Sequence, residues 1–284
     1  MTNIVRAACV QMTPGVTIEG NIEHSTALIR AAHADGAQIV GMPEVANLCQ
    51  KSRRHALETA QYEENEPALK AWQKLADELD IWLLAGSMVI KTAEDKLVNR
   101  AYMIAPDGAI AATYDKIHMF DVDLPTGERY RESDLFTPGD KAVLVDSPWG
   151  GIGITICYDV RFPHLYRALA KAGANMIWTS AAFTRTSGKA HWHVMQRARA
   201  IETGSWILAP AQCGDHEDGR STYGHAVIVS PWGEVVADAG EEPGYIIADL
   251  DLSRVAEARQ SIPTLRHDRD FAMPAQLGLR ATGE

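Results

Sequence analysis

The chain has 284 residues, of which 46% are hydrophobic and 23% are charged, a composition typical of globular proteins and unlike that of disordered or collagen-like chains. Its 27 Lys and Arg residues against 37 Asp and Glu residues give a net charge of −10, so we expect neither nucleic acid nor membrane as a partner. Four cysteines without a Cys-x-x-Cys pair, and no apolar run of signal-peptide or membrane-span length, predict a cytoplasmic protein.

Short apolar runs alternate with helix-period segments through the first half of the chain. This pattern predicts strands and helices in the order strand 4–11, helix 21–35, strand 38–42, helix 66–79 and strand 81–90. A hairpin of strands 99–105 and 109–114 then turns at Pro-Asp-Gly. The polar stretch 121–141 predicts a long surface loop that could cover a cleft.

The same order restarts near residue 151. It predicts strand 152–157, a helix from Pro163, strand 175–179, helix 189–201, strand 206–211 and a second hairpin. Residues 36–40 match 173–177 and residues 101–108 match 226–233 in residue type, which indicates an internal duplication. We therefore predict one α/β domain over 1–284, a four-layer α-β-β-α sandwich of two mixed sheets. The alternative is a chance likeness between two Pro-x-Gly hairpins.

Cys157 ends a buried-strand run, and Pro163 begins a helix shortly afterwards. Backbone N–H groups and the positive end of a helix at such a point would stabilise a thiolate, which is the form of cysteine that attacks carbonyl carbons. A small buried core residue is the alternative, and it is our interpretation of Cys9, Cys49 and Cys213.

Two other charged residues lie where a charge is costly. Glu44 directly follows strand 38–42, which we interpret as the first-half counterpart of the Cys157 position, and a carboxylate there needs a partner or a task. Lys116 lies among apolar residues at the exit of the first hairpin and would be partly desolvated. A helix-capping or exposed glutamate and a solvated lysine are the alternatives.

Together these segments resemble the three signature segments of the nitrilase, or carbon-nitrogen hydrolase, superfamily. They are Met42-Pro43-Glu44, the run Tyr-Asp-Lys-Ile-His at 114–118, and Gly-Ile-Thr-Ile-Cys-Tyr-Asp-Val-Arg-Phe-Pro at 153–163. The resemblance covers nearly the whole chain and implies the four-layer sandwich of that family. It also implies a cysteine-dependent hydrolase that needs water and no cofactor or metal.

The resemblance implies a role for each matching residue. Cys157 would attack an amide carbon to form a thioester, Glu44 would move protons as general base and acid, and Lys116 with the backbone N–H of Tyr158 would stabilise the oxyanion. Glu132, in Tyr-Arg-Glu-Ser at 130–133, matches a second family glutamate that orients the lysine or the substrate.

Segments 183–192, 197–202, 211–214 and 223–225 are similar to the deaminated glutathione amidase branch and to the related omega-amidases. Both branches imply release of ammonia from a linear amide of a small carboxylate-bearing substrate. The Cys-Tyr-Asp at 157–159 differs from the Cys-Trp-Glu of true nitrilases. Hydrolysis of an N-carbamoyl amino acid or another aliphatic amide, and a catalytically silent binding module, remain alternatives.

The negative net charge means that local cations must hold a carboxylate substrate, and Arg161, Arg185 and Lys189 follow the strands nearest the cysteine. The substrate contacts that we predict are Arg161, Phe183, Thr184, Arg185 and His191. Two residues differ from those that the two branches usually carry, so we expect the wall of the substrate pocket to differ as well. His193 stands where the branches usually have Glu, and Gln50 stands where omega-amidases tend to have Tyr.

A zinc site is the metal alternative, built from His191, His193, His216, His225 and Cys213. We predict none, because a His-x-His pair on a helix points its rings to different faces. The family resemblance further implies a homodimer, to which residues 254–265 and the tail 266–284 would contribute, while 281–284 would fray.

Overall fold

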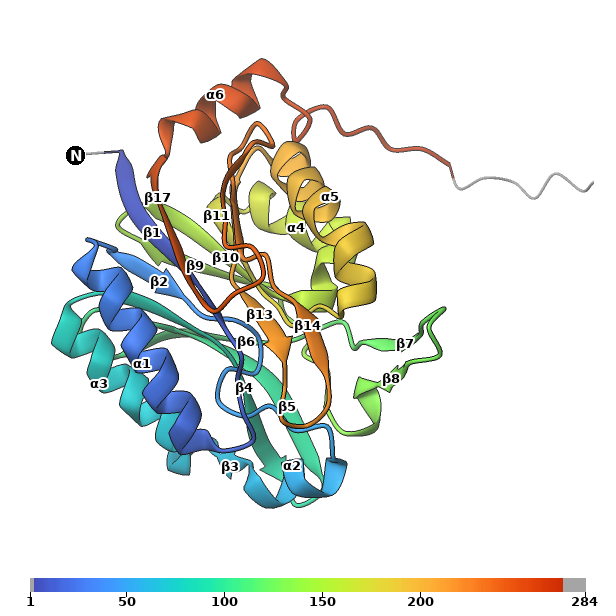
Figure 1. The fold of residues 1–284 in the computed structure, drawn as a ribbon. Helices are drawn as coiled ribbons and strands as arrows, with labels where there is room; N and C mark the ends of the chain where they lie inside the picture. Colours follow the sequence, from blue (N-terminus) through green and yellow to red (C-terminus); the bar gives the residue numbers. More distant parts are fainter. Residues whose placement is uncertain (1–2, 273–284) are drawn as a thin grey trace, which may run out of the picture.

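In the computed structural model, residues 3–272 form two packed β-sheets with helices on both outer faces (Figure 1). The first sheet has nine strands, and its main path runs β14 (Ser221–Tyr223), β13 (Ala211–Asp215), β1 (Ile4–Met12), β2 (Ile39–Gly41), β4 (Trp82–Ala93), β5 (Lys96–Ile104) and β6 (Ile110–Asp115). Off this path, β17 (Gly244–Asp251) pairs with β1 and β3 (Gln61–Tyr62) pairs with β4.

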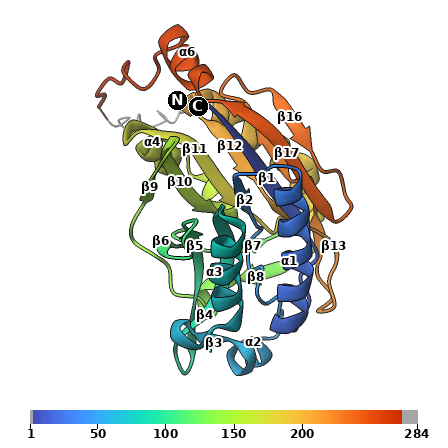
Figure 2. The ribbon, with the colours of Figure 1, turned by 90° about the vertical axis from the view of Figure 1, so that its left-hand side faces the viewer.

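The second sheet has six strands in the order β16 (Val235–Asp238), β15 (Val227–Val229), β12 (Trp206–Ala209), β11 (Ala174–Ser180), β10 (Gly150–Ile156) and β9 (Val143–Ser147). The first sheet is covered by α1 (Ile18–Ala34) and α3 (Pro67–Leu79), which lie side by side in Figure 2, and the second by α4 (Pro163–Lys171) and α5 (Arg185–Thr203). The predicted four-layer α-β-β-α class is confirmed.

The two sheets repeat one topology. In the first, β1, β2 and β4 are parallel neighbours and β5 and β6 follow antiparallel; in the second, β10, β11 and β12 are parallel and β15 and β16 follow antiparallel. This agreement supports the predicted duplication. It also corrects the prediction that Glu44 and Cys157 hold equivalent positions in the two halves. Glu44 follows β2, whose counterpart is β11, whereas Cys157 follows β10, the counterpart of β1.

Alternation along β1 divides its side chains between two cores. Val5, Ala7 and Cys9 pack between the sheets, whereas Ala8 and Val10 pack under α1 and α3. All five side chains are fully buried. This strand therefore lies at the centre of the molecule, with both faces covered.

The α1 and α3 helices are joined to each other by a buried hydrogen bond. Trp72 of α3 is fully buried, and its Nε1 donates to Ser25 Oγ of α1 at 3.0 Å. Pro67 begins α3, where its missing N–H costs nothing, and Asp80 ends the helix in the left-handed conformation. The apolar face of α3 and the residues at its two ends thus agree with the helix that the sequence predicts over 66–79.

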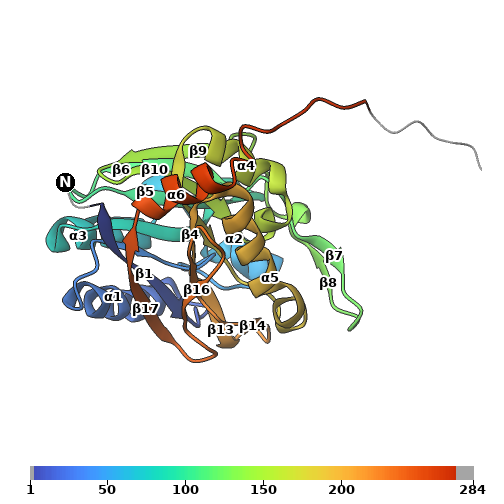
Figure 3. The same ribbon diagram turned by 90° about the horizontal axis from the view of Figure 1, so that it is seen from above.

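Residues 121–141 do not form the continuous loop that the sequence predicts. They contain the hairpin of β7 (Asp121–Asp123) and β8 (Arg129–Arg131), followed by a short 3-10 turn at Glu132–Asp134. Figures 1 and 3 show this hairpin projecting from the side of the sandwich. The turn after it places Glu132 back against the sheet edge.

The sequence pattern missed several elements. These are β3, β9, β13, β14 and β17, with α2 (Arg53–Thr59) and α6 (Ser253–Ser261). None of the helices within residues 3–272 is long and apolar enough to span a membrane. The expectation for the end of the tail, residues 273–284, lies outside the described part of the chain.

Candidate active site

Cys157 is the first residue after β10 and begins the 3-10 turn Cys157–Arg161. Its φ of +47° lies in the left-handed region, which costs a non-glycine residue about 1–3 kcal/mol and recurs at functional sites. The backbone reverses direction here, which presents the side chain at the carboxyl end of the sheet. The cysteine predicted as nucleophile is therefore held in a strained turn.

Asp159 holds this turn in place. Its fully buried carboxylate accepts hydrogen bonds from the backbone N–H of Ile156 at 2.9 Å, from the Tyr114 hydroxyl at 2.7 Å and from the backbone N–H of His118 at 3.2 Å. Tyr114 and His118 lie on either side of Lys116, and Ile156 directly precedes Cys157. One carboxylate thus fixes two candidate catalytic segments relative to each other.

Lys116 lies between two glutamates. Its Nζ donates to Glu44 Oε1 at 2.8 Å and to both carboxylate oxygens of Glu132, at 2.9 and 2.8 Å. Asn99 Nδ2 donates to the same two glutamates, at 2.9 Å to Glu44 and 3.3 Å to Glu132. The backbone N–H of Phe120 donates to Glu132 at 2.6 Å. Residues more than 80 positions apart in the sequence therefore form one network.

The ionisation of this network follows from its burial. Desolvation alone would lower the pKa of the buried Lys116 ammonium, but the carboxylates of Glu132 and Glu44 outweigh it and raise that pKa well above its usual value. The lysine is therefore a fixed cation. A buried cation with two carboxylates avoids the penalty of an unpaired charge.

The Cys157 thiol does not carry the lowered pKa that its position before a helix suggests. Burial raises its pKa, the nearby Glu44 carboxylate raises it further, and the Lys116 ammonium and the Ala182 N–H only partly oppose this. These effects favour loss of the thiol proton to a neighbouring base during attack, and not a thiolate that is present before the substrate binds.

These side chains line a cavity of about 450 Å³. Its walls include Cys157, Glu44, Lys116, Glu132, Tyr158, Phe183, Thr184, Asn99, Gln212, Gln50 and Arg220. Phe183 and Thr184, both predicted as substrate contacts, lie in this wall. The volume is in the range of sites for small molecules.

The other predicted substrate contacts do not line this cavity. Arg161 lies over the rings of Tyr158 and Phe183, and its Nη1 is 3.3 Å from the Nδ1 of His191. Arg185 pairs with Asp215 at 3.0 Å on the exposed side of α5. Arg161, Arg185 and His191 are thus absent from the lining, although Arg161 packs on two aromatic residues that form the wall.

Three polar residues of the site were missed by the sequence analysis. Asn99 and Asp159 act as described above, and Gln212 Nε2 donates to the backbone carbonyl of Glu44 at 2.7 Å. Asn99 lies in a strand whose alternation gives no hint of a polar role, and Gln212 contacts Glu44 across 168 residues. For Asp159, the signal was its position two residues after the cysteine.

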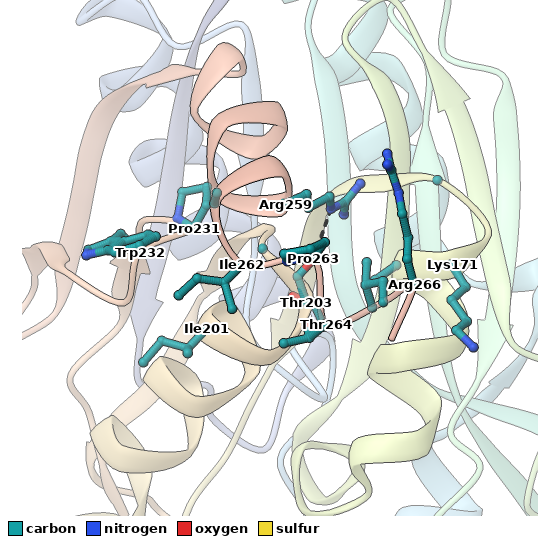
Figure 4. Close-up of a pocket in the computed structure, with 15 residues that line it drawn as sticks. Lys171, Ile201, Thr203, Pro231, Trp232, Arg259, Ile262, Pro263, Thr264 and Arg266 are labelled. Carbon is teal, nitrogen blue, oxygen red and sulfur yellow. Dashed lines mark hydrogen bonds between the residues drawn. The ribbon is translucent and has the colours of Figure 1, made fainter. Parts of the chain in front are cut away.

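A second cavity, of about 560 Å³, lies away from this network (Figure 4). It is lined by residues from α4, α5, the β15–β16 turn, α6 and the segment after α6, among them Ile201, Trp232, Ile262 and Arg259. Arg259 closes one side by donating to the Thr203 carbonyl at 3.0 Å. Its lining holds none of the candidate catalytic side chains.

Comparison with known proteins identifies the family of the chain. The carbon-nitrogen hydrolase family model matches residues 6–260. The chain belongs to this family. As a carbon-nitrogen hydrolase it is 41% identical over 266 residues to the deaminated glutathione amidase of Synechocystis, covering 92% of this chain and 97% of that protein. It is 36% identical to human omega-amidase NIT2 over 267 residues, covering 93% and 95%.

Solved structures of carbon-nitrogen hydrolases share the fold. The Caenorhabditis elegans NitFhit protein is 34% identical with a TM-score of 0.88, and the match covers 94% of this chain and 66% of that one, so this chain spans about two thirds of NitFhit. Saccharomyces cerevisiae Nit3 is 26% identical with a TM-score of 0.83, over 92% and 94% of the two chains.

The ionisation of the thiol can be tested directly. We expect the Cys157 thiol to titrate above its usual value of 9.0, and Glu44→Gln to lower its pKa because a negative charge beside the thiol is removed. The ultraviolet absorbance of thiolate against pH, with the titration of Cys157→Ala subtracted, measures both values. A wild-type thiolate already present at neutral pH, or an upward shift in Glu44→Gln, would contradict this account.

Proposed function

We propose that this carbon-nitrogen hydrolase cleaves a linear amide of a small carboxylate-bearing substrate, of the deaminated-glutathione or omega-amide type, and releases ammonia. One observation carries the proposal: the Cys157 thiol, the Glu44 carboxylate and the Lys116 ammonium that donates to it line one cavity with basic residues in its wall. The names of the two curated relatives support the choice of an amide.

The proposed reaction begins with attack of Cys157 Sγ on the amide carbon while Glu44 takes the thiol proton. The Lys116 ammonium and the Tyr158 backbone N–H stabilise the negative oxygen of the tetrahedral species. The C–N bond then breaks, Glu44 gives its proton to the leaving nitrogen, and a thioester remains. Ammonia is the first product.

Water completes the cycle. Glu44, again a carboxylate, takes a proton from a water molecule as its oxygen attacks the thioester carbon. The C–S bond breaks, and the proton held by Glu44 returns to the sulfur. Glu132 supports both halves, because its two hydrogen bonds to Lys116 hold the ammonium while Glu44 changes charge.

Arg220 is the cation that we propose as the partner of the substrate carboxylate. It lies in the cavity wall with 28% of its side chain exposed, and its Nε donates to Asp218 at 2.7 Å while its Nη2 donates to Cys49 Sγ at 3.0 Å. These contacts fix the plane of the guanidinium. Arg129 and Arg131 also line the cavity, but both pair with Asp123 on the projecting hairpin.

We further propose a homodimer. Exposed apolar side chains gather on α5, the β15–β16 hairpin and the segment after α6: Val194, Ile201, Trp232, Val236 and Ile262. Val194 is 69% and Trp232 54% exposed, and Ile201, Trp232 and Ile262 line one surface cavity, an apolar grouping of the kind that marks an interface. A cytoplasmic location is supported by the cysteines, which are all unpaired.

Ammonia release tests the proposed reaction. Purified protein is assayed with deaminated glutathione, α-ketoglutaramate, simple aliphatic amides, N-carbamoyl amino acids and nitriles. We expect turnover of a carboxylate-bearing amide, a loss of about 10³-fold or more in Cys157→Ala, and a loss of about 10²- to 10³-fold in Lys116→Met.

The matched control for the nucleophile is Cys9→Ala, which removes a buried thiol from β1 and should retain turnover. Equal activity in wild type and Cys157→Ala would overturn the assignment of the nucleophile. Turnover of N-carbamoyl amino acids or neutral amides alone would select one of those alternatives, and ligand binding without any turnover would identify a silent binding module.

Arg220→Gln tests recognition of the carboxylate. We expect KM for the carboxylate-bearing amide to rise about 10- to 100-fold because a charge-assisted hydrogen bond is lost, with kcat changed far less. An uncharged amide of similar size should show no rise in KM. Arg185→Gln is measured in parallel, and a larger rise in KM there would place the anchor on α5 and contradict the role of Arg220.

The dimer is tested by the double variant Ile201→Asp with Trp232→Glu, examined by sedimentation velocity. We expect the wild type to sediment as a dimer and the variant as a monomer, because two charges would be buried in the apolar contact. Ile110→Asp, at an exposed apolar site on β6, is the matched control and should remain dimeric. A monomeric wild type would rule out the proposal.

A further inference from the structure

Three potential metal ligands converge outside the candidate active site. His193 lies on α5, His225 directly precedes β15, and Asp238 ends β16. His193 Nε2 is 2.8 Å from Asp238 Oδ2, and His225 Nδ1 is 2.9 Å from Asp238 Oδ1. The three donor atoms lie within 4.8 Å of one another.

The surrounding structure fixes the orientation of both rings. His225 has a φ of +56°, its N–H donates to the Gly240 carbonyl at 2.7 Å, and its carbonyl accepts from Trp192 Nε1 at 2.6 Å. The ring of His225 stacks on Tyr223 with centroids 4.5 Å apart, and the ring of His193 meets it edge-on at 5.1 Å. The two imidazoles are therefore held in place before any ligand arrives.

The electrostatics of the cluster suit a cation. Among the ion pairs of the described residues, Asp238 has only the two histidines as partners. The three side chains are partly exposed, so an ion can reach them from solvent.

We propose that His193, His225 and Asp238 bind one divalent first-row cation, for which Zn²⁺ is the probe. Two imidazoles and one carboxylate are a donor set that such cations favour, and water can fill the remaining positions. On binding, each imidazole takes the tautomer whose hydrogen lies on the ring nitrogen away from the metal, and the carboxylate loses its hydrogen bonds to the rings.

This site is structural. None of its three ligands lines the cavity that holds Cys157, so the cation takes no part in the proposed hydrolysis. It would add a metal bridge between α5 and the β15–β16 hairpin, which these three side chains connect through the contact of His193 with Asp238. A bound ion stabilises the folded state over the unfolded chain.

The test is a titration of chelator-treated protein with ZnCl₂ by calorimetry, together with a thermal unfolding scan. All proteins carry Cys157→Ala, so that zinc on the active-site thiol is not counted. We expect one zinc ion per chain and a rise in Tm. The affinity for zinc should fall about 10- to 100-fold in His193→Ala and in Asp238→Asn.

His191→Ala is the matched control, because it removes another histidine two positions earlier on the same helix. It should bind zinc like its parent. Equal binding by His193→Ala and its parent, an equal loss in His191→Ala, or the absence of a saturable site would overturn the proposal and leave a hydrogen-bonded His-Asp-His network. The zinc measurements do not depend on turnover, so failure of the proposed amidase function leaves them unaffected.

Discussion

The candidate site depends on one buried ion network, in which the Lys116 ammonium is shared by the carboxylates of Glu44 and Glu132. Removing three charges from water is costly, and close contacts with opposite charges and Asn99 offset that cost. The network needs three segments of chain in register: the end of β2, the exit of β6 and the turn after β8. Much of the fold around the cavity serves to hold these three segments together.

The first sheet is completed by the second half of the chain. β13 and β17 both pair with β1, and Gln212 of β13 donates to the carbonyl of Glu44. The proposed general base is therefore positioned from both halves, while the proposed nucleophile follows a strand of the second sheet. This interlocking explains why duplication of the topology did not produce two independent sites: each half supplies different parts of one.

Much of the fold could be predicted because local patterns carry it. Alternation in β1, the capped apolar face of α3 and the Pro-x-Gly hairpins are each visible within a dozen residues, and the motif around Cys157 identified the candidate nucleophile. Contacts between distant residues were not visible. Nothing local reveals that Arg220 reaches the cavity or that Arg185 turns away to Asp215. The raised pKa of the Cys157 thiol was not visible either, because it depends on burial in the folded protein and on Glu44, which comes from the other sheet.

Two requirements oppose each other at Cys157, because the left-handed backbone favours glycine whereas the proposed reaction needs a thiol. Glycine would adopt this conformation without steric cost, so a chain with glycine there would relieve the backbone strain and lose the proposed nucleophile. Selection against this strain alone would remove the side chain on which the proposed turnover depends. Inactive descendants of such an enzyme are therefore expected to relax at this residue first, and a glycine after the corresponding strand would mark a member kept for its shape.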